Sequence, residues 1–113
     1  MKLNELTIKE ARERLDKGEI TALELTNACL KEITLKDSEI KTCLTVCADS
    51  ARAEAQEADK RIQAGEKGAL LGIPYLCKDN LINKGIRTTA ASKMLENYIA
   101  PYDATVIKRL KLS

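Results

Sequence analysis

Lys78 is the side chain in this sequence that is best suited to acid–base chemistry. It follows directly on the apolar run of residues 70–77, and Asp79 and Asn80 come after it. The run is typical of a buried strand, and a lysine at the end of such a strand loses solvation. Desolvation lowers the pKa of a lysine, and a neutral lysine can take a proton from a serine hydroxyl. On spacing alone we favour the simpler interpretation, a strand-end lysine whose ammonium reaches water.

Neighbouring polar side chains are weaker candidates. Asp79 and Asn80 could hold a lysine in place, but both residue types are also common in turns. A thiol nucleophile at Cys77 is disfavoured, because successive side chains of a strand point to opposite faces. Three hydroxyl side chains follow: Thr88, Thr89 and Ser92. Turn and capping roles explain them better than nucleophilic catalysis.

The sequence contains no histidine, which excludes Ser-His-Asp and Cys-His mechanisms built from these residues. The four cysteines are Cys29, Cys43, Cys47 and Cys77. They form no Cys-x-x-Cys pair, so we predict no metal site. No cofactor site is predicted either. We interpret the cysteines as reduced thiols of a cytoplasmic protein.

Charge and aromatic content argue against a nucleic-acid surface in these residues. The 19 Lys and Arg residues and the 17 Asp and Glu residues are interspersed, and the net charge is only +2. With three Tyr and no Phe or Trp, the chain offers little for base stacking. No apolar run approaches the length of a membrane helix, so no membrane contact is predicted.

Two capping boxes predict the first two helices. Thr7 stands three residues before Glu10, and Gly18 is a stop signal for the helix that follows. Thr21 and Glu24 repeat the pattern at once. We expect these helices to form a helical hairpin.

Further helices and two strands complete the predicted fold. A third helix is expected over residues 50–63, and a last one over residues 104–110 with Asp103 as its N-cap. Residues 42–46 and 70–77 are short and apolar or β-branched, which predicts strands. The predicted class is therefore α/β, with the helical hairpin followed by helices packed on the first strands of a mixed sheet.

Residues 72–80, Gly-Ile-Pro-Tyr-Leu-Cys-Lys-Asp-Asn, resemble the Gly-Ile-Pro-x-x-x-Lys-Asp-Asn run of the amidase-signature family. More narrowly, residues 18–25, 84–98 and 101–106 resemble the A subunits of tRNA-dependent amidotransferases. The resemblance extends to about residue 110. It implies that residues 1–113 are the N-terminal fragment of a single amidase domain, truncated at its C-terminus.

The family's chemistry is carried by a Ser-cis-Ser-Lys triad that hydrolyses amides through an acyl-enzyme, and Lys78 falls on its lysine. Both serines of the family lie downstream in a Gly- and Ser-rich segment. Ser92 is too close to Lys78 to be the family's cis serine. The resemblance therefore implies that this chain is inactive alone.

In the A subunits this chemistry frees ammonia from glutamine. The B subunit uses the ammonia, with ATP and magnesium, to convert Glu-tRNA(Gln) or Asp-tRNA(Asn) to Gln-tRNA(Gln) or Asn-tRNA(Asn), and a C subunit clasps the two. The resemblance thus implies B and C subunits as partners, glutamine as substrate, and tRNA only through the complex.

Two alternatives stay open. The chain could be a non-catalytic binding or regulatory module that acts through its helical hairpin. It could also be a fragment of a stand-alone amidase acting on small amides, which the match over residues 84–98 disfavours. In either case we expect the isolated chain to be only marginally stable.

Overall fold

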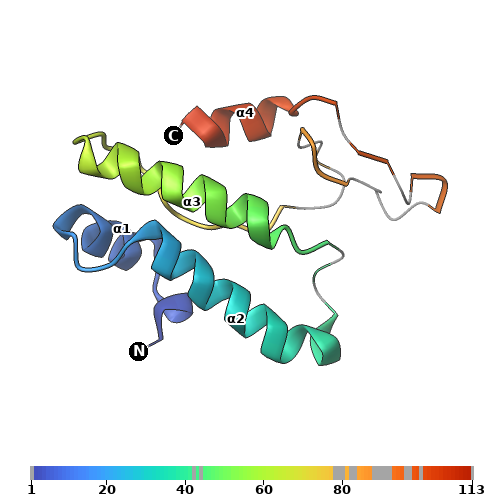
Figure 1. The fold of residues 1–113 in the computed structure, drawn as a ribbon, viewed down its shortest axis with the longest axis horizontal. Coiled ribbons are helices and arrows are strands. Elements are labelled where there is room, and N and C mark those ends of the chain that lie inside the picture. The colour runs from blue at the N-terminus through green and yellow to red at the C-terminus, as the bar shows by residue number, and fades with distance from the viewer. Residues whose placement is uncertain are drawn as a thin grey trace. The chain divides into compact units, whose positions relative to one another are not determined.

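The structure is a computed structural model of the chain, and it describes residues 2–41, 43, 45–77, 81, 84–87, 93–95, 98–99 and 101–112. Its regular elements are helical (Figure 1): η1 (Leu3–Glu5), α1 (Ile8–Lys17), α2 (Ala22–Ile40), α3 (Ala48–Gln63), η2 (Lys93–Leu95) and α4 (Thr105–Leu112). The chain divides into two compact units, Met1–Pro74 and Tyr75–Ser113.

The predicted capping box at the start of α1 is confirmed. The Glu10 N–H donates to Thr7 Oγ1 at 3.2 Å, and the Thr7 N–H donates to Glu10 Oε2 at 2.8 Å. The bond from the Thr7 N–H holds the pKa of Glu10 below its usual value, because it favours the ionised carboxylate. Gly18 ends the helix in the left-handed conformation, with φ of 74°. Both boundaries were therefore predicted by local sequence.

The N-terminus of α2 has acceptors from two parts of the chain. Thr21 Oγ1 accepts from the Glu24 N–H at 3.1 Å, as its capping box predicts. Asp59 of α3 accepts from the Ala22 N–H at 2.6 Å and from the Leu23 N–H at 3.1 Å. The first three N–H groups of α2, which no intrahelical carbonyl can reach, are all bonded. The Asp59 carboxylate thus joins α3 to the positive end of α2.

Asp59→Ala is expected to lower the free energy of unfolding of the first unit by about 2 kcal/mol, because two partly buried N–H groups lose their acceptor. Urea unfolding followed by far-UV circular dichroism measures the change. Asp49→Ala is the control, since Asp49 lies on the same helix with a fully exposed side chain. Its expected cost is below about 0.5 kcal/mol. Equal costs for the two variants would contradict the capping role.

The core of the first unit is aliphatic. Its buried residues come from α1, α2, α3 and the loop before α2: Ala11, Leu15, Ile20, Ala22, Leu25 and Ala55. The helices α2 and α3 lie side by side and antiparallel (Figure 1), and α2 also packs on η1. The predicted hairpin of α1 and α2 is therefore wrong, because the main packing partner of α2 is α3. The helix α1 contributes Ala11 and Leu15 to the same core.

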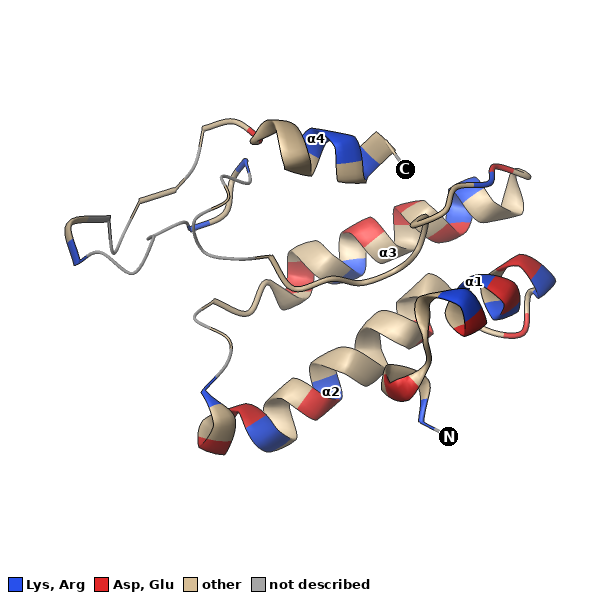
Figure 2. Cartoon of the chain, turned by 180° about the vertical axis from the view of Figure 1, so that it is seen from behind, with Lys and Arg blue, Asp and Glu red and all other residues tan. Residues whose placement is uncertain are grey.

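Charged residues lie outside this core. Residues of both charge signs are interspersed along α3, whereas residues 25–30, in the first half of α2, carry no charge (Figure 2). The buried residues Leu25 and Thr26 lie in this uncharged stretch. The last ten residues of α2 hold no buried residue, and Leu35 and Ile40 are exposed there.

The strand predicted over residues 70–77 is wrong. Residues 69–72 form a turn and residues 73–77 are irregular. Gly72 has φ of 82°, which an extended strand does not accommodate, and Pro74 has no N–H to donate to a ladder. In the other predicted strand, residues 42–46, the described residues 43, 45 and 46 are not in a strand either. The mixed sheet of the predicted fold is therefore not seen in the described ranges.

The second unit contains α4 and one isolated antiparallel bridge, between Arg87 and Ile99. Asp103 does not act as the predicted N-cap. Its Oδ1 accepts from the Lys84 N–H at 2.7 Å and its Oδ2 from Lys111 Nζ at 3.0 Å. The bond from the Lys84 N–H, and then the Lys111 ammonium, hold the pKa of Asp103 below its usual value. The carboxylate thus fixes residue 84 to α4.

Within the described part of the chain, every helix is too short or too polar to cross a membrane.

Candidate functional site

Lys78 lies outside the described residues, and so do Asp79, Asn80, Thr88, Thr89 and Ser92. The predicted role of Lys78 therefore stays a prediction. Cys77, the last described residue before it, is exposed. The structure does describe residues 68–73, which precede Lys78 in the sequence, and residues of three helices contact this segment.

A tight turn precedes Lys78. The Leu71 N–H donates to the Gly68 carbonyl at 3.3 Å, and the Ile73 N–H donates to the Leu70 carbonyl at 3.1 Å. Gly72 occupies the third position of the second turn, where a positive φ favours glycine. Leu71 is only 5% exposed. The turn thus places the Leu71 side chain in the interior of the first unit.

Gly72 lies where the three helices meet. A Cβ built on it would lie 3.2 Å from Ile62 Cδ1 of α3, 3.3 Å from Ala22 Cβ of α2 and 3.3 Å from Leu15 Cδ1 of α1. These separations are shorter than ordinary van der Waals contact, so the close approach requires a residue without a side chain. The glycine of the Gly-Ile-Pro run therefore seats the segment against the helical core.

Arg12 of α1 also holds this turn. Its Nη1 donates to the Leu71 carbonyl, and its Nη2 donates to Asp16 Oδ1 at 2.8 Å. Only 14% of the Arg12 side chain is exposed. The hydrogen bond from Arg12 lowers the pKa of Asp16, and the charges of Arg12 and Lys67 add to this. The role of Arg12 could not be predicted from the sequence, because its backbone partner lies 59 residues away.

The chain leaves the core after Ile73, which packs partly buried against the helices. Tyr75 is 47% exposed and Leu76 is 69% exposed. The prediction that Lys78 follows a buried strand is therefore wrong, since the residues directly before it face solvent. A pKa argument from strand burial cannot be used for this lysine.

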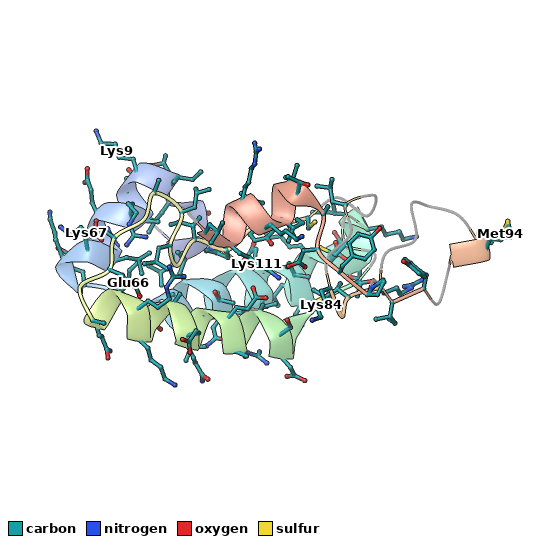
Figure 3. All side chains as sticks on the ribbon, turned by 90° about the horizontal axis from the view of Figure 1, so that it is seen from above. Lys9, Glu66, Lys67, Lys84, Met94 and Lys111 are labelled. Carbon is teal, nitrogen blue, oxygen red and sulfur yellow. The ribbon has the colours of Figure 1, made fainter. Side chains whose placement is uncertain are left out.

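Exposed apolar side chains gather in the second unit. Of the twelve large apolar residues that are exposed in the described part of the chain, eight belong to it: Tyr75, Leu76, Met94, Tyr98, Ile99, Tyr102, Val106 and Leu112. Met94 is 96% exposed and projects from its end of the unit (Figure 3). Such density of apolar surface is typical of a region that packs on further protein.

Two shallow grooves mark the surface of the first unit. One has a volume of about 390 Å³ and lies between α2 and α3, lined by Asn27, Leu30, Lys31, Thr34, Val46, Ala48 and Arg52. The other, of about 370 Å³, adjoins the Arg12 contact and is lined by Arg12, Asp16, Lys67, Gly68 and Ala69. Among the described residues, no three Cys, Asp or Glu side chains are grouped so that they could hold a metal ion.

Comparisons with known proteins agree with the sequence motifs. The sequence model of the family described as Amidase matches residues 24–113. The A subunit of the glutamyl-tRNA(Gln) amidotransferase of Roseiflexus sp. (strain RS-1) is 51% identical over 109 residues, which is 96% of this chain. The A subunit of the same name from Francisella tularensis subsp. novicida (strain U112) is 54% identical over 104 residues, or 92% of this chain. The chain spans 22% of the length of each of these relatives.

Solved structures share the fold of the described chain. Two structures of a vestigial protein complex, reported to reveal the evolutionary origins of an s-triazine catabolic enzyme, match with TM-scores of 0.87 and 0.88. Each is 30% identical, and the match covers 95% of this chain and 24% of that one. The family model and the curated relatives confirm the resemblance inferred from residues 72–80 and 84–98.

Proposed function

This chain belongs to the amidase family, and from that premise we propose that it is the N-terminal part of a glutamine-hydrolysing A subunit of a tRNA-dependent amidotransferase. One observation carries the proposal: identity of 51% and 54%, over more than nine-tenths of the chain, to two proteins named as A subunits of glutamyl-tRNA(Gln) amidotransferase. Identity at this level over nearly the whole chain favours glutamine as the substrate over the small carboxamides of a stand-alone amidase.

In the proposed reaction a serine hydroxyl attacks the carboxamide carbon of glutamine. The amide nitrogen leaves as ammonia, and water then hydrolyses the acyl-enzyme to glutamate and free serine. Lys78 is the group in this chain that would move the protons: it takes one from the attacking serine and supplies one to the leaving nitrogen. The serines would come from the rest of the domain, so the chain by itself should not hydrolyse amides.

The proposed partners follow from the same relatives. The ammonia would pass to a B subunit, which binds ATP and magnesium and amidates Glu-tRNA(Gln) or Asp-tRNA(Asn), and a C subunit would join the two. This chain would bind no cofactor and would reach tRNA only through the complex. Such an enzyme of translation would work in the cytoplasm. The exposed apolar residues of the second unit support the idea that further protein covers them.

Ammonia release tests the proposal. We would measure it with glutamine, asparagine and small carboxamides, for this chain alone and for the full-length enzyme that contains it, assembled with B and C subunits. The expected result is release from glutamine by the assembled enzyme, at least about tenfold faster than from small amides, and none by the chain alone.

A preference for small carboxamides would favour the stand-alone amidase instead. The family model that matches residues 24–113 is described only as Amidase, and this is the observation that keeps the second candidate open. Hydrolysis by the chain alone would contradict both candidates, because it would require a nucleophile within these 113 residues.

A further inference from the structure

We infer that the groove between α2 and α3 is a docking surface for a separate protein, which presents a carboxylate beside a large apolar side chain. The volume of the groove, about 390 Å³, is within the range that is typical of binding clefts. The described residues that line it all belong to the first unit, and docking there requires no step of the proposed reaction.

The described lining of the groove combines positive charge with apolar surface. Lys31 and Arg52 are cations, and none of the described lining residues is an acid. The apolar part of the lining consists of Leu30, Val46 and Ala48. Val46 is 49% exposed, so a bound side chain can reach it. The groove is thus complementary to an acidic group that lies next to an apolar one.

Arg52 is oriented by a hydrogen bond across the groove. Its Nε donates to Asn27 Oδ1 at 2.9 Å, which links α3 to α2. Asp49 Oδ1 is 3.9 Å from Arg52 Nη1, too far for a hydrogen bond, and the Asp49 side chain is fully exposed. Because the guanidinium is planar and rigid, the bond at Nε fixes the direction of both Nη groups. A carboxylate can bind these two groups through parallel hydrogen bonds.

Lys31 supplies a second positive charge to the same groove. It lies four residues after Asn27, so the two side chains are neighbours on one face of α2. Lys31 is exposed, and in the described part of the chain no carboxylate lies within salt-bridge distance of its ammonium. Glu32, the acid next to it in the sequence, pairs with Lys36 instead. A carboxylate that enters the groove therefore displaces no hydrogen-bonded ion pair of Lys31 or Arg52.

These charges distinguish a separate protein from the other possible occupants. Lysine is almost never buried inside a domain unless it is paired, which disfavours further segments of the same domain over Lys31. A symmetric second copy would bring Lys31 and Arg52 of both chains together, and like charges would repel. Interfaces between proteins have a polar rim and are enriched in arginine. Leu35 of α2, 63% exposed, offers such an interface a further apolar contact.

Site-specific photo-crosslinking tests this docking surface. The full-length protein that contains this chain would be produced in its native host with p-benzoylphenylalanine in place of Thr34, a residue of the groove. After irradiation, mass spectrometry identifies the cross-linked peptide. We expect a peptide of another protein, with Asp or Glu close to a large apolar residue. Replacing that acid by its amide should lower the cross-link yield at least about fivefold.

Variants of the groove itself make the test specific. Arg52→Gln and Lys31→Gln should each lower the yield at least about fivefold, and Arg52→Gln should have little further effect once the partner's acid is an amide. Lys60→Gln, an exposed residue of α3 outside the groove, should leave the yield within about twofold. Lys31→Gln removes no ion pair of the described chain, so it keeps the test valid if Arg52→Gln loosens the contact with Asn27.

Several outcomes would overturn the docking surface. They are no cross-link from position 34, a cross-linked peptide without an acid, and a peptide that belongs to the same chain or to a second copy of it. Equal yields with and without Lys31→Gln and Arg52→Gln would also overturn it. Failure of the proposed function would look different, because a protein that does not hydrolyse glutamine would still give the expected cross-link.

Discussion

Lys78→Met is expected to lower kcat for glutamine hydrolysis by the assembled enzyme roughly a thousandfold, the range over which a general acid–base contributes. Methionine has about the length and apolar character of the lysine stem but cannot bind or release a proton. Because Lys78 would act on the serine and the leaving nitrogen, not on the carboxylate or amine of glutamine, KM should stay within about threefold. Stopped-time ammonia assays over a range of glutamine concentrations measure both constants.

Two further variants make the Lys78 prediction specific. Lys78→Arg keeps the positive charge but does not release a proton near neutral pH, so it should lose nearly as much activity as Lys78→Met. Lys9→Met, on the exposed face of α1 (Figure 3), should leave kcat unchanged. Full activity of Lys78→Arg would mean that the lysine supplies charge only. Full activity of Lys78→Met would remove it from the mechanism.

Helix boundaries were predictable because the signals that set them are local. Thr7 and Glu10 satisfy each other's N–H groups within four residues, as do Thr21 and Glu24. Gly18 ends α1 where the pattern predicts. The third helix was predicted over residues 50–63 and spans Ala48–Gln63, so its end was placed correctly and its start two residues late.

The strands were mispredicted because an apolar run does not specify its own conformation. Residues 70–77 alternate little, and their Leu and Ile side chains suit a buried strand as well as a packed turn. What decides between them is φ at Gly72, which follows from the space left where Leu15, Ala22 and Ile62 meet. That space is a product of the tertiary structure, and no local pattern reports it.

Two long-range contacts of the first unit could not be predicted from local patterns either. Arg12 reaches Leu71 across 59 residues, and Asp59 reaches Ala22 across 37. In the sequence, Arg12 and Asp59 are not distinguishable from the other charged residues of their helices. The prediction of Lys78 came from the order of residues 72–80 and from the resemblance they carry. The structure adds how the start of that run is held.

Gly72→Ala is expected to lower the free energy of unfolding of the first unit by about 3 kcal/mol. Part of this cost, about 1–2 kcal/mol, comes from placing an L side chain at φ of 82°. The rest comes from overpacking, which typically costs about 1–3 kcal/mol, because the new Cβ would meet Ile62 Cδ1, Ala22 Cβ and Leu15 Cδ1 within 3.3 Å. Urea unfolding followed by far-UV circular dichroism measures the loss.

Gly65→Ala separates the two contributions. Gly65 has φ of 88°, in the same unit, but no atom lies within 4 Å of a Cβ built there. Its substitution should therefore cost only the backbone part, about 1–2 kcal/mol. Ile62→Val removes the nearest clashing carbon, so the loss caused by Gly72→Ala should be smaller in the Ile62→Val background than in wild type. If Gly72→Ala costs no more than Gly65→Ala, the three helices do not close on the turn.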